Sequence, residues 1–250
     1  MSAKDKPVNS RAGLIDAVRG AAVISMVVYH LCYDIFVVFG ADTGFERYWP
    51  VRVWQSSICF VFIIVSGIAV NFSRHGYRRG IILNLCGFAV TAVTVIFTPT
   101  QAVWFGVLNL LGCSMMIVFA LRAKLAAVNP SAGMAVSLAL FLVLYGLPER
   151  YIGLPGLRLI NMPDVLYGCR YFAFLGFPSS DFFSADYFPL LPWIFLYAFG
   201  FFLWRFMAEK GLQGRFDRRV PALGFIGRYS LWIYLAHQPV LYGICLLIFG

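Results

Sequence analysis

The stretch LIDAVRGAAVISMVVYHLCYDIF, residues 14–36, decides the fold class of this protein. It lies in an apolar run over residues 13–40, and a bilayer is crossed by about 20 mostly apolar residues in a helix. Six further apolar runs follow, near residues 51–72, 80–98, 104–121, 132–147, 188–206 and 223–249. The sequence therefore predicts an all-α, polytopic membrane helix bundle of about seven transmembrane helices.

The composition also indicates lipid as the surroundings of the chain. Hydrophobic residues make up 61% of the 250 residues and charged residues 12%, whereas a soluble domain carries about 25% charged residues. The net charge of +9 does not indicate nucleic acid, because the basic residues lie between the apolar runs. The six cysteines are scattered, with no pair at the spacing of metal ligands. We expect a single domain over residues 1–250, without a metal and without a nucleic-acid partner.

The distribution of basic residues predicts the topology. If the N-terminus is cytoplasmic, fifteen of the twenty Lys and Arg residues fall in cytoplasmic segments, as the positive-inside rule requires. The C-terminus then lies outside the membrane. The longest connection, residues 148–187, lies on the outer side, and within it PDVLYGCRYFAFLGFP (residues 163–178) is apolar enough for an interfacial or re-entrant helix. Asp186 precedes Pro189 and is expected to cap the sixth helix.

The first run carries several residues that are costly at bilayer depth, and such residues are functional candidates by default. At about 100° per residue, the step from Arg19 to His30 is three turns plus about 20°, so the two side chains share a helix face. Asp16, Tyr33 and Asp34 extend this polar stripe by one turn at each end. Two interpretations stay open: the stripe faces a cavity, or Asp16 pairs with Arg19 while His30 and Asp34 bond to neighbouring helices.

A second polar stripe lies in SLWIYLAHQP of the last run. Ser230, Tyr234 and His237 follow at steps of four and three residues, and Gln238 is adjacent. His237 is either a functional group or a packing residue. Asn109, in FGVLNLLG, either joins two helices by a hydrogen bond or belongs to the same cavity.

Five motifs in order, beginning with LIDAVRGAAVISMVVYHLCYDIF, resemble the heparan-α-glucosaminide N-acetyltransferase-like family, and in particular its small bacterial branch. The others are FIIVSGIAVNFSRHGYRRG, WFGVLNLLG, SADYFPLLPWIFLYAFG and IGRYSLWIYLAHQPVL. The spacing of Arg19 and His30 also resembles the arginine–ten residues–histidine signature of the wider transmembrane acyltransferases. Members of the family often carry histidine where Asn109 stands here.

The resemblance implies an enzyme of the bacterial inner membrane that transfers an acyl group, in particular acetyl, from cytoplasmic acyl-CoA to a glycan or lipid-linked sugar outside. It implies His30 as the favoured general base, His237 as the second candidate and Asp34 as a group that orients the imidazole. Arginines near the cytoplasmic ends suit the phosphates of CoA: Arg19, Arg78, Arg79, Arg218, Arg219 and Arg228. The expected partners are the bilayer, acyl-CoA and the acceptor, and a homo-oligomer stays open.

A second class of function fits the same residues. Intramembrane Asp, Arg and His also gate substrates in small non-enzymatic transporters and flippases. Inverted repeats would favour that class, and we find no internal repeat in the sequence.

Overall fold

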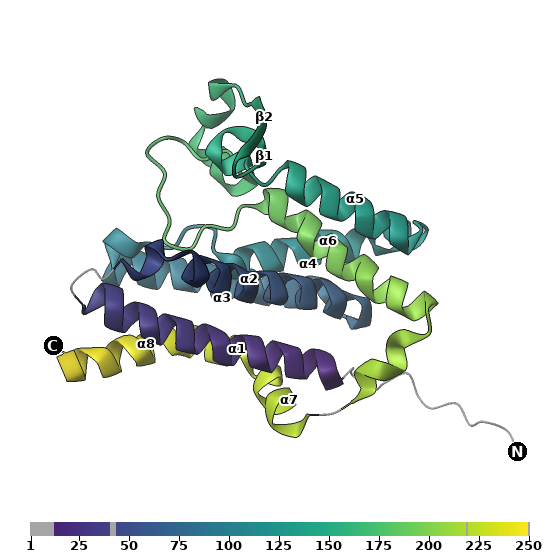
Figure 1. Ribbon diagram of the computed structural model, residues 1–250, viewed down its shortest axis with the longest axis horizontal. Coiled ribbons are helices and arrows are strands. Elements are labelled where there is room, and N and C mark those ends of the chain that lie inside the picture. Colours follow the sequence, from purple (N-terminus) through teal and green to yellow (C-terminus); the bar gives the residue numbers. More distant parts are fainter. Residues whose placement is uncertain (1–12, 41–43, 219, 250) are drawn as a thin grey trace, which may run out of the picture. The chain divides into compact units, whose positions relative to one another are not determined.

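The computed structural model describes residues 13–40, 44–218 and 220–249, and this part of the chain is built mainly of helices (Figure 1). Among these residues, seven helical spans are long and apolar enough to cross a membrane, which confirms the predicted fold class. They are α1 (Gly13–Tyr33, continued by a π-helix over Asp34–Val38), α2 (Trp49–Ala69, continued by a 3-10 turn over Val70–Phe72), α3 (Gly76–Phe97), α4 (Val107–Ala126), α5 (Pro130–Val143, whose span continues through the 3-10 helix Leu147–Glu149), α6 (Leu190–Glu209) and α8 (Ser230–Phe249).

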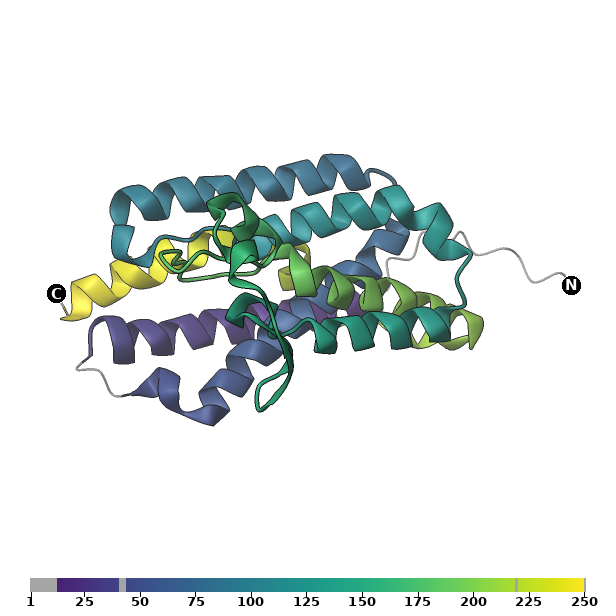
Figure 2. The same cartoon turned by 90° about the horizontal axis from the view of Figure 1, so that it is seen from above.

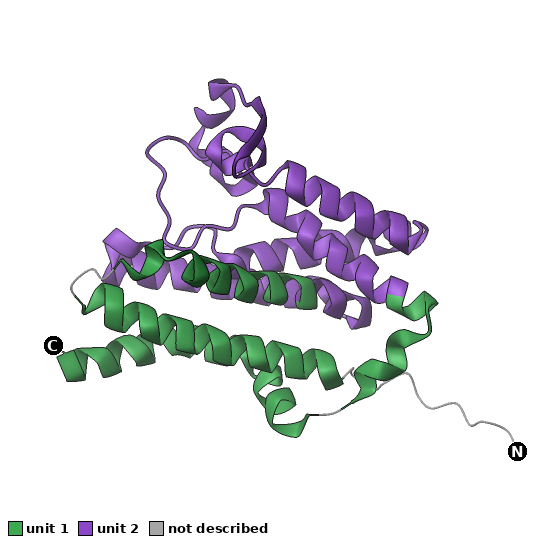
Figure 3. Cartoon of the chain, in the orientation of Figure 1, with its two compact units in different colours: residues 1–65, 207–250 green, residues 66–206 purple. Residues whose placement is uncertain are grey.

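The chain divides into two compact units (Figure 3). Unit 1 comprises residues 1–65 and 207–250 and contains α1, most of α2 and α8. Unit 2 comprises residues 66–206 and contains α3 to α6.

In unit 1, α1 packs against two elements from the end of the chain. These are the short helix α7 (Pro221–Arg228) and α8. Along α1, His30 lies beside His237 and Phe39 follows beside Tyr242. Positions therefore increase in the same direction on both helices, and α1 and α8 run parallel.

The predicted last run, residues 223–249, is divided in the structure. Tyr229 ends α7 with φ −96° and ψ 11°, and α8 begins at Ser230. The reason for the separate helix is its contact with α1: Gly20 faces the backbone of Leu223, and Gly227 faces the backbone of Asp16. A short helix in a different direction from α8 makes this close backbone contact.

In unit 2, α3 and α4 lie alongside each other (Figure 2), and glycines lie where the two helices pack closely. A methyl group on Gly87 would stand 2.6 Å from Oδ1 of Asn109, and one on Gly112 would overlap the Asn84 amide. Small residues let transmembrane helices approach closely, so larger side chains at these positions would separate α3 from α4.

The longest connection, residues 148–187, has a more complex structure than the single helix that the sequence suggested. The antiparallel strands β1 (Tyr151–Leu154) and β2 (Leu157–Asn161) form a hairpin. The apolar stretch 163–178 then contains two 3-10 helices, Asp164–Tyr167 and Arg170–Leu175, instead of an α-helix. Whether this stretch lies at the membrane interface stays a prediction.

Ion pairs and hydrogen bonds within residues 148–187 hold the segments of this connection together. Arg150 pairs with Asp164 at 2.8 Å, and Arg170 pairs with Asp181. The hydroxyl of Tyr187 donates to the carbonyl oxygen of Ala173. Burial raises the pKa of Tyr187, so this phenol keeps its proton at neutral pH and remains a donor.

Asp186 caps a helix, but the observed cap belongs to α4. Its Oδ2 accepts a hydrogen bond from the backbone N–H of Val107, the first residue of α4, at 3.3 Å. A carboxylate at this position satisfies one of the free N–H groups at a helix start. The expectation of a cap on α6 missed this contact because the partners are distant in sequence.

Candidate active site

Two histidines from the two polar stripes meet in unit 1. The ring centroids of His30 on α1 and His237 on α8 are 4.8 Å apart, with the ring planes tilted by 59°. Tyr234 lies one turn before His237, with the two rings 5.5 Å apart. Both histidines are partly buried in helices that are apolar enough to cross a membrane. The structure therefore brings together three candidates that the sequence placed in two separate runs.

Beside the histidines, a hydrogen bond joins α1 to α8. The side-chain Nε2 of Gln238 donates to Oδ1 of Asp34 at 2.8 Å, and Asp34 is fully buried. The π-helix begins at Asp34, where the N–H of Phe39 bonds to the Asp34 carbonyl at 2.9 Å. Single π-turns within α-helices are frequent at functional sites. The carboxyl group predicted to orient His30 thus contacts Gln238 and holds the two helices together there.

Two aromatic side chains, Tyr29 and Trp54, pack one behind the other next to His30, and the amino-acid sequence did not predict this packing. The ring of Tyr29 meets the ring of His30 edge-on at 5.5 Å and that of Trp54 at 5.4 Å. The indole N–H of Trp54 donates to Oγ of Ser25 at 2.8 Å, which fixes α2 against α1. Tyr29 adjoins a candidate in the sequence, but nothing in a single sequence indicates that Trp54 contacts it.

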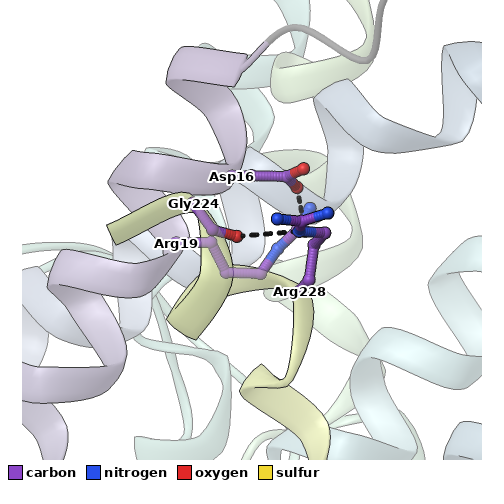
Figure 4. A network of polar contacts seen from close by, with 4 residues as sticks. All are labelled: Asp16, Arg19, Gly224 and Arg228. Atoms are coloured by element: carbon purple, nitrogen blue, oxygen red, sulfur yellow. Dashed lines mark hydrogen bonds and ion pairs between the residues drawn. The ribbon is translucent and has the colours of Figure 1, made fainter. Parts of the chain in front are cut away.

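A second polar cluster lies where α1 crosses α7 (Figure 4). Arg19 donates to Asp16 at 2.9 Å, one turn earlier on α1. Arg228 donates through Nε to the carbonyl oxygen of Gly224 at 3.3 Å. Figure 4 shows the two arginine side chains gathered beside Asp16. The pairing of Asp16 with Arg19 is one of the two interpretations that the sequence left open.

The backbone contact beneath this cluster gives a stability prediction. In Gly227→Ala the new methyl group would overlap the carbonyl oxygen of Asp16. The two helices would have to separate, and overpacking of this kind costs about 1–3 kcal/mol. We expect a lower melting temperature in detergent. Gly224→Ala is the matched control, because a methyl group there meets nothing within 4 Å and alanine favours a helix. Equal melting temperatures for the two variants would contradict the close crossing.

The remaining candidates lie elsewhere. Ser230 is the first residue of α8 and Tyr33 the last of α1. Arg218 is exposed after the 3-10 helix Leu212–Asp217, and Arg219 lies outside the described residues. Unit 2 holds exposed Arg78 and Arg79 and buried Asn109.

Asn109 joins two helices of unit 2. Its Nδ2 donates to the carbonyl oxygen of Asn84 at 3.5 Å, across the packing of α3 and α4. Asn84 in turn accepts from the thiol of Cys113 at 3.3 Å. These contacts agree with the interhelical alternative, and a role in a cavity stays a prediction. Among the described residues, no group of three or more His, Cys, Asp or Glu could hold a metal ion.

Comparison with known proteins supplies the family. Residues 11–239 match the family model described as heparan-alpha-glucosaminide N-acetyltransferase, catalytic. No curated protein and no solved structure matches the chain. The family match extends over both units and includes the histidine pair, and it confirms the resemblance seen in the motifs. It supports a membrane acetyltransferase type of function. The chain belongs to the heparan-alpha-glucosaminide N-acetyltransferase catalytic family.

Proposed function

We propose that this protein transfers an acetyl group from cytoplasmic acetyl-CoA to a glycan or lipid-linked sugar on the outer side of the bacterial inner membrane. The family match supports the acetyltransferase chemistry, since acetyl-CoA is the general donor of this family. The observation that carries the proposal for these residues is the pairing of His30 and His237 within membrane-spanning helices. Two imidazoles in such surroundings are costly without a function.

In the proposed reaction, His30 is the general base. The acceptor oxygen or nitrogen attacks the thioester carbon, and the His30 imidazole takes its proton as the new bond forms. The C–S bond then breaks, and the CoA thiolate leaves and takes up the proton. The rings of Tyr29 and His237 both contact the His30 ring, which would hold the base in place. His237 is the second candidate for the same role.

The donor is proposed to bind with its phosphates at the crossing of α1 and α7. Arg19 and Arg228 lie there, and the five N–H donors of a guanidinium match the oxygens of a phosphate group. Along α1, His30 lies about 16 Å beyond Arg19 at 1.5 Å per residue. The extended arm of CoA would carry the thioester over this distance to the histidine pair.

The parallel course of α1 and α8 supports the proposed topology. Two parallel crossings require an odd number of crossings between them, and five helices of sufficient length lie between α1 and α8. We expect reporter fusions after Arg74 and after Gly250 to report the cytoplasm and the outside, respectively. If both fusions report the same compartment, one of the seven helices does not cross the membrane.

The proposed function is tested with the full chain, purified in detergent or nanodiscs. It is incubated with acetyl-CoA labelled in the acetyl group and with a cell-envelope extract, and the labelled product is identified. We expect label in a glycan or lipid-linked sugar. If no acetyl group is transferred, and the chain in proteoliposomes moves an unmodified substrate across the bilayer, the result would favour a transporter or flippase instead.

A further inference from the structure

Three buried polar atoms in unit 1 belong to residues at the contact between α8 and the end of the first membrane helix. They are Oδ2 of Asp34, Nε2 of His237 and Oε1 of Gln238, and within the described part of the chain none of them has a hydrogen-bond partner. Buried polar atoms in proteins are nearly always hydrogen-bonded, so each exception requires an explanation. Among the described residues of unit 1, these exceptions all belong to the contact between the first and the last membrane helix, and one of them is in the ring beside the proposed base.

The contacts of His237 determine which of its nitrogens carries the proton. Nδ1 lies 2.5 Å from the carbonyl oxygen of Tyr234. A carbonyl oxygen only accepts hydrogen bonds, so Nδ1 is the protonated nitrogen of the neutral ring. Nε2 then carries a lone pair. This nitrogen can only accept a hydrogen bond from another group.

The contacts of Gln238 determine its orientation in the same way. Its amide nitrogen donates to Asp34, and therefore its amide oxygen, Oε1, faces away from that bond as an acceptor. His237 and Gln238 are adjacent on α8. The structure thus provides two hydrogen-bond acceptors on successive residues of α8, one in the ring that lies beside His30 and the other in the side chain bonded to Asp34.

We propose that Nε2 of His237 and Oε1 of Gln238 form the subsite for the acceptor substrate. They would accept hydrogen bonds from hydroxyl groups that neighbour the reacting group, while the reacting group faces His30. A sugar ring, with hydroxyls on adjacent carbons, has this chemistry, whereas a simple alcohol or amine does not. The inference rests on the proposed function and adds to it the residues that select the acceptor. Asp34 is a positioning residue, because it orients the Gln238 amide.

The test uses two amines that differ by one hydroxyl. Cyclohexylamine and trans-2-aminocyclohexanol share a six-membered ring and the reacting amine, and only the second has a neighbouring O–H. With labelled acetyl-CoA, we expect the purified wild-type chain to prefer trans-2-aminocyclohexanol about tenfold or more in kcat/KM, since a buried acceptor left without its donor is costly. Equal kcat/KM values for the two amines would overturn the proposal.

Two variants separate this subsite from a merely structural bond. Gln238→Lys keeps a donor to Asp34 but removes one of the two acceptors, so it should lower the preference through a higher KM for trans-2-aminocyclohexanol. The exchange Asp34→Asn with Gln238→Glu reverses the hydrogen bond between the helices and keeps an acceptor oxygen at both positions. It should retain the preference. An undiminished preference in Gln238→Lys would overturn the proposal.

The envelope extract provides a test that does not depend on the two amines. At limiting extract, Gln238→Lys should transfer less acetyl to it than the exchanged double variant does, with equal affinity for acetyl-CoA. Equal transfer by the two variants would overturn the subsite while leaving the proposed function intact. If the wild-type chain acetylates neither the amines nor the extract, the proposed function fails and the subsite fails with it.

Discussion

His30→Ala is expected to lower the rate of acyl transfer by about 10²–10⁴-fold, which is the usual loss when a general base is removed. The affinity for acetyl-CoA should be unchanged, because the imidazole acts on the proton of the acceptor and lies far along α1 from Arg19. The measurements are the initial rate of acetyl transfer and calorimetric binding of acetyl-CoA to the purified chain.

His30→Gln distinguishes a base from a packing residue. Glutamine keeps a polar group of similar size beside the rings of Tyr29 and His237, but it is not basic at neutral pH. A catalytic role therefore predicts that both variants are nearly inactive and that both remain folded. A structural role predicts an active glutamine variant and a thermally unstable alanine variant. That second outcome would contradict the proposed base and make His237 the favoured candidate.

The membrane-spanning helices could be predicted because their signal is local. Each crossing needs a run of apolar residues of a certain length, and this is visible without knowledge of any partner. The predicted ends differ by a few residues: α3, for example, begins at Gly76 and not at residue 80. The division between α7 and α8 was missed. In IGRYSLW the position where α7 ends is occupied by Tyr229, which is not a helix-breaking residue. The break depends on the contact of Gly227 with α1.

The candidate residues could be predicted from the free-energy cost of polar groups in a membrane, but the contacts between them could not. Asp34, His30 and His237 are candidates because polar groups are costly in a membrane. This argument requires only the residue type and its position within an apolar run. The contact of His30 with His237 and the bond of Gln238 to Asp34 join opposite ends of the chain. Periodicity gives the face of each helix, but not which two faces meet. Trp54 was missed for the same reason, because it supports the site from another helix.

Local pairing was easier to predict than long-range pairing. Asp16 and Arg19 are three residues apart in a helix, a spacing at which opposite charges meet, and the sequence already gave this pair as one alternative. The same bond is an obstacle to the proposed donor site, since a guanidinium neutralised by a carboxylate attracts phosphate less strongly. The role of Arg19 is therefore best tested together with Asp16.

Replacing Arg19 and Arg228 by glutamine is expected to weaken acetyl-CoA binding by roughly tenfold or more for each arginine. A hydrogen bond to a charged group contributes about 1.5–3 kcal/mol, and about 1.4 kcal/mol corresponds to a tenfold change in affinity. Calorimetry on the full chain measures the loss. The wild-type affinity should also fall as salt rises, because exposed charges are screened. Arg78→Gln with Arg79→Gln examines the exposed arginine pair of α3 in the same assay.

Asp16→Asn is the matched control for Arg19. It removes the carboxylate that Arg19 contacts but leaves the guanidinium, so a phosphate-binding Arg19 should hold acetyl-CoA as tightly as before, or more tightly. If Arg19 instead serves to fix the first turn of α1 through Asp16, the asparagine variant should lose affinity as the Arg19→Gln variant does. Similar losses in these two variants would remove Arg19 from the donor site. In that case Arg228 on α7 would be left to bind the phosphates at this crossing.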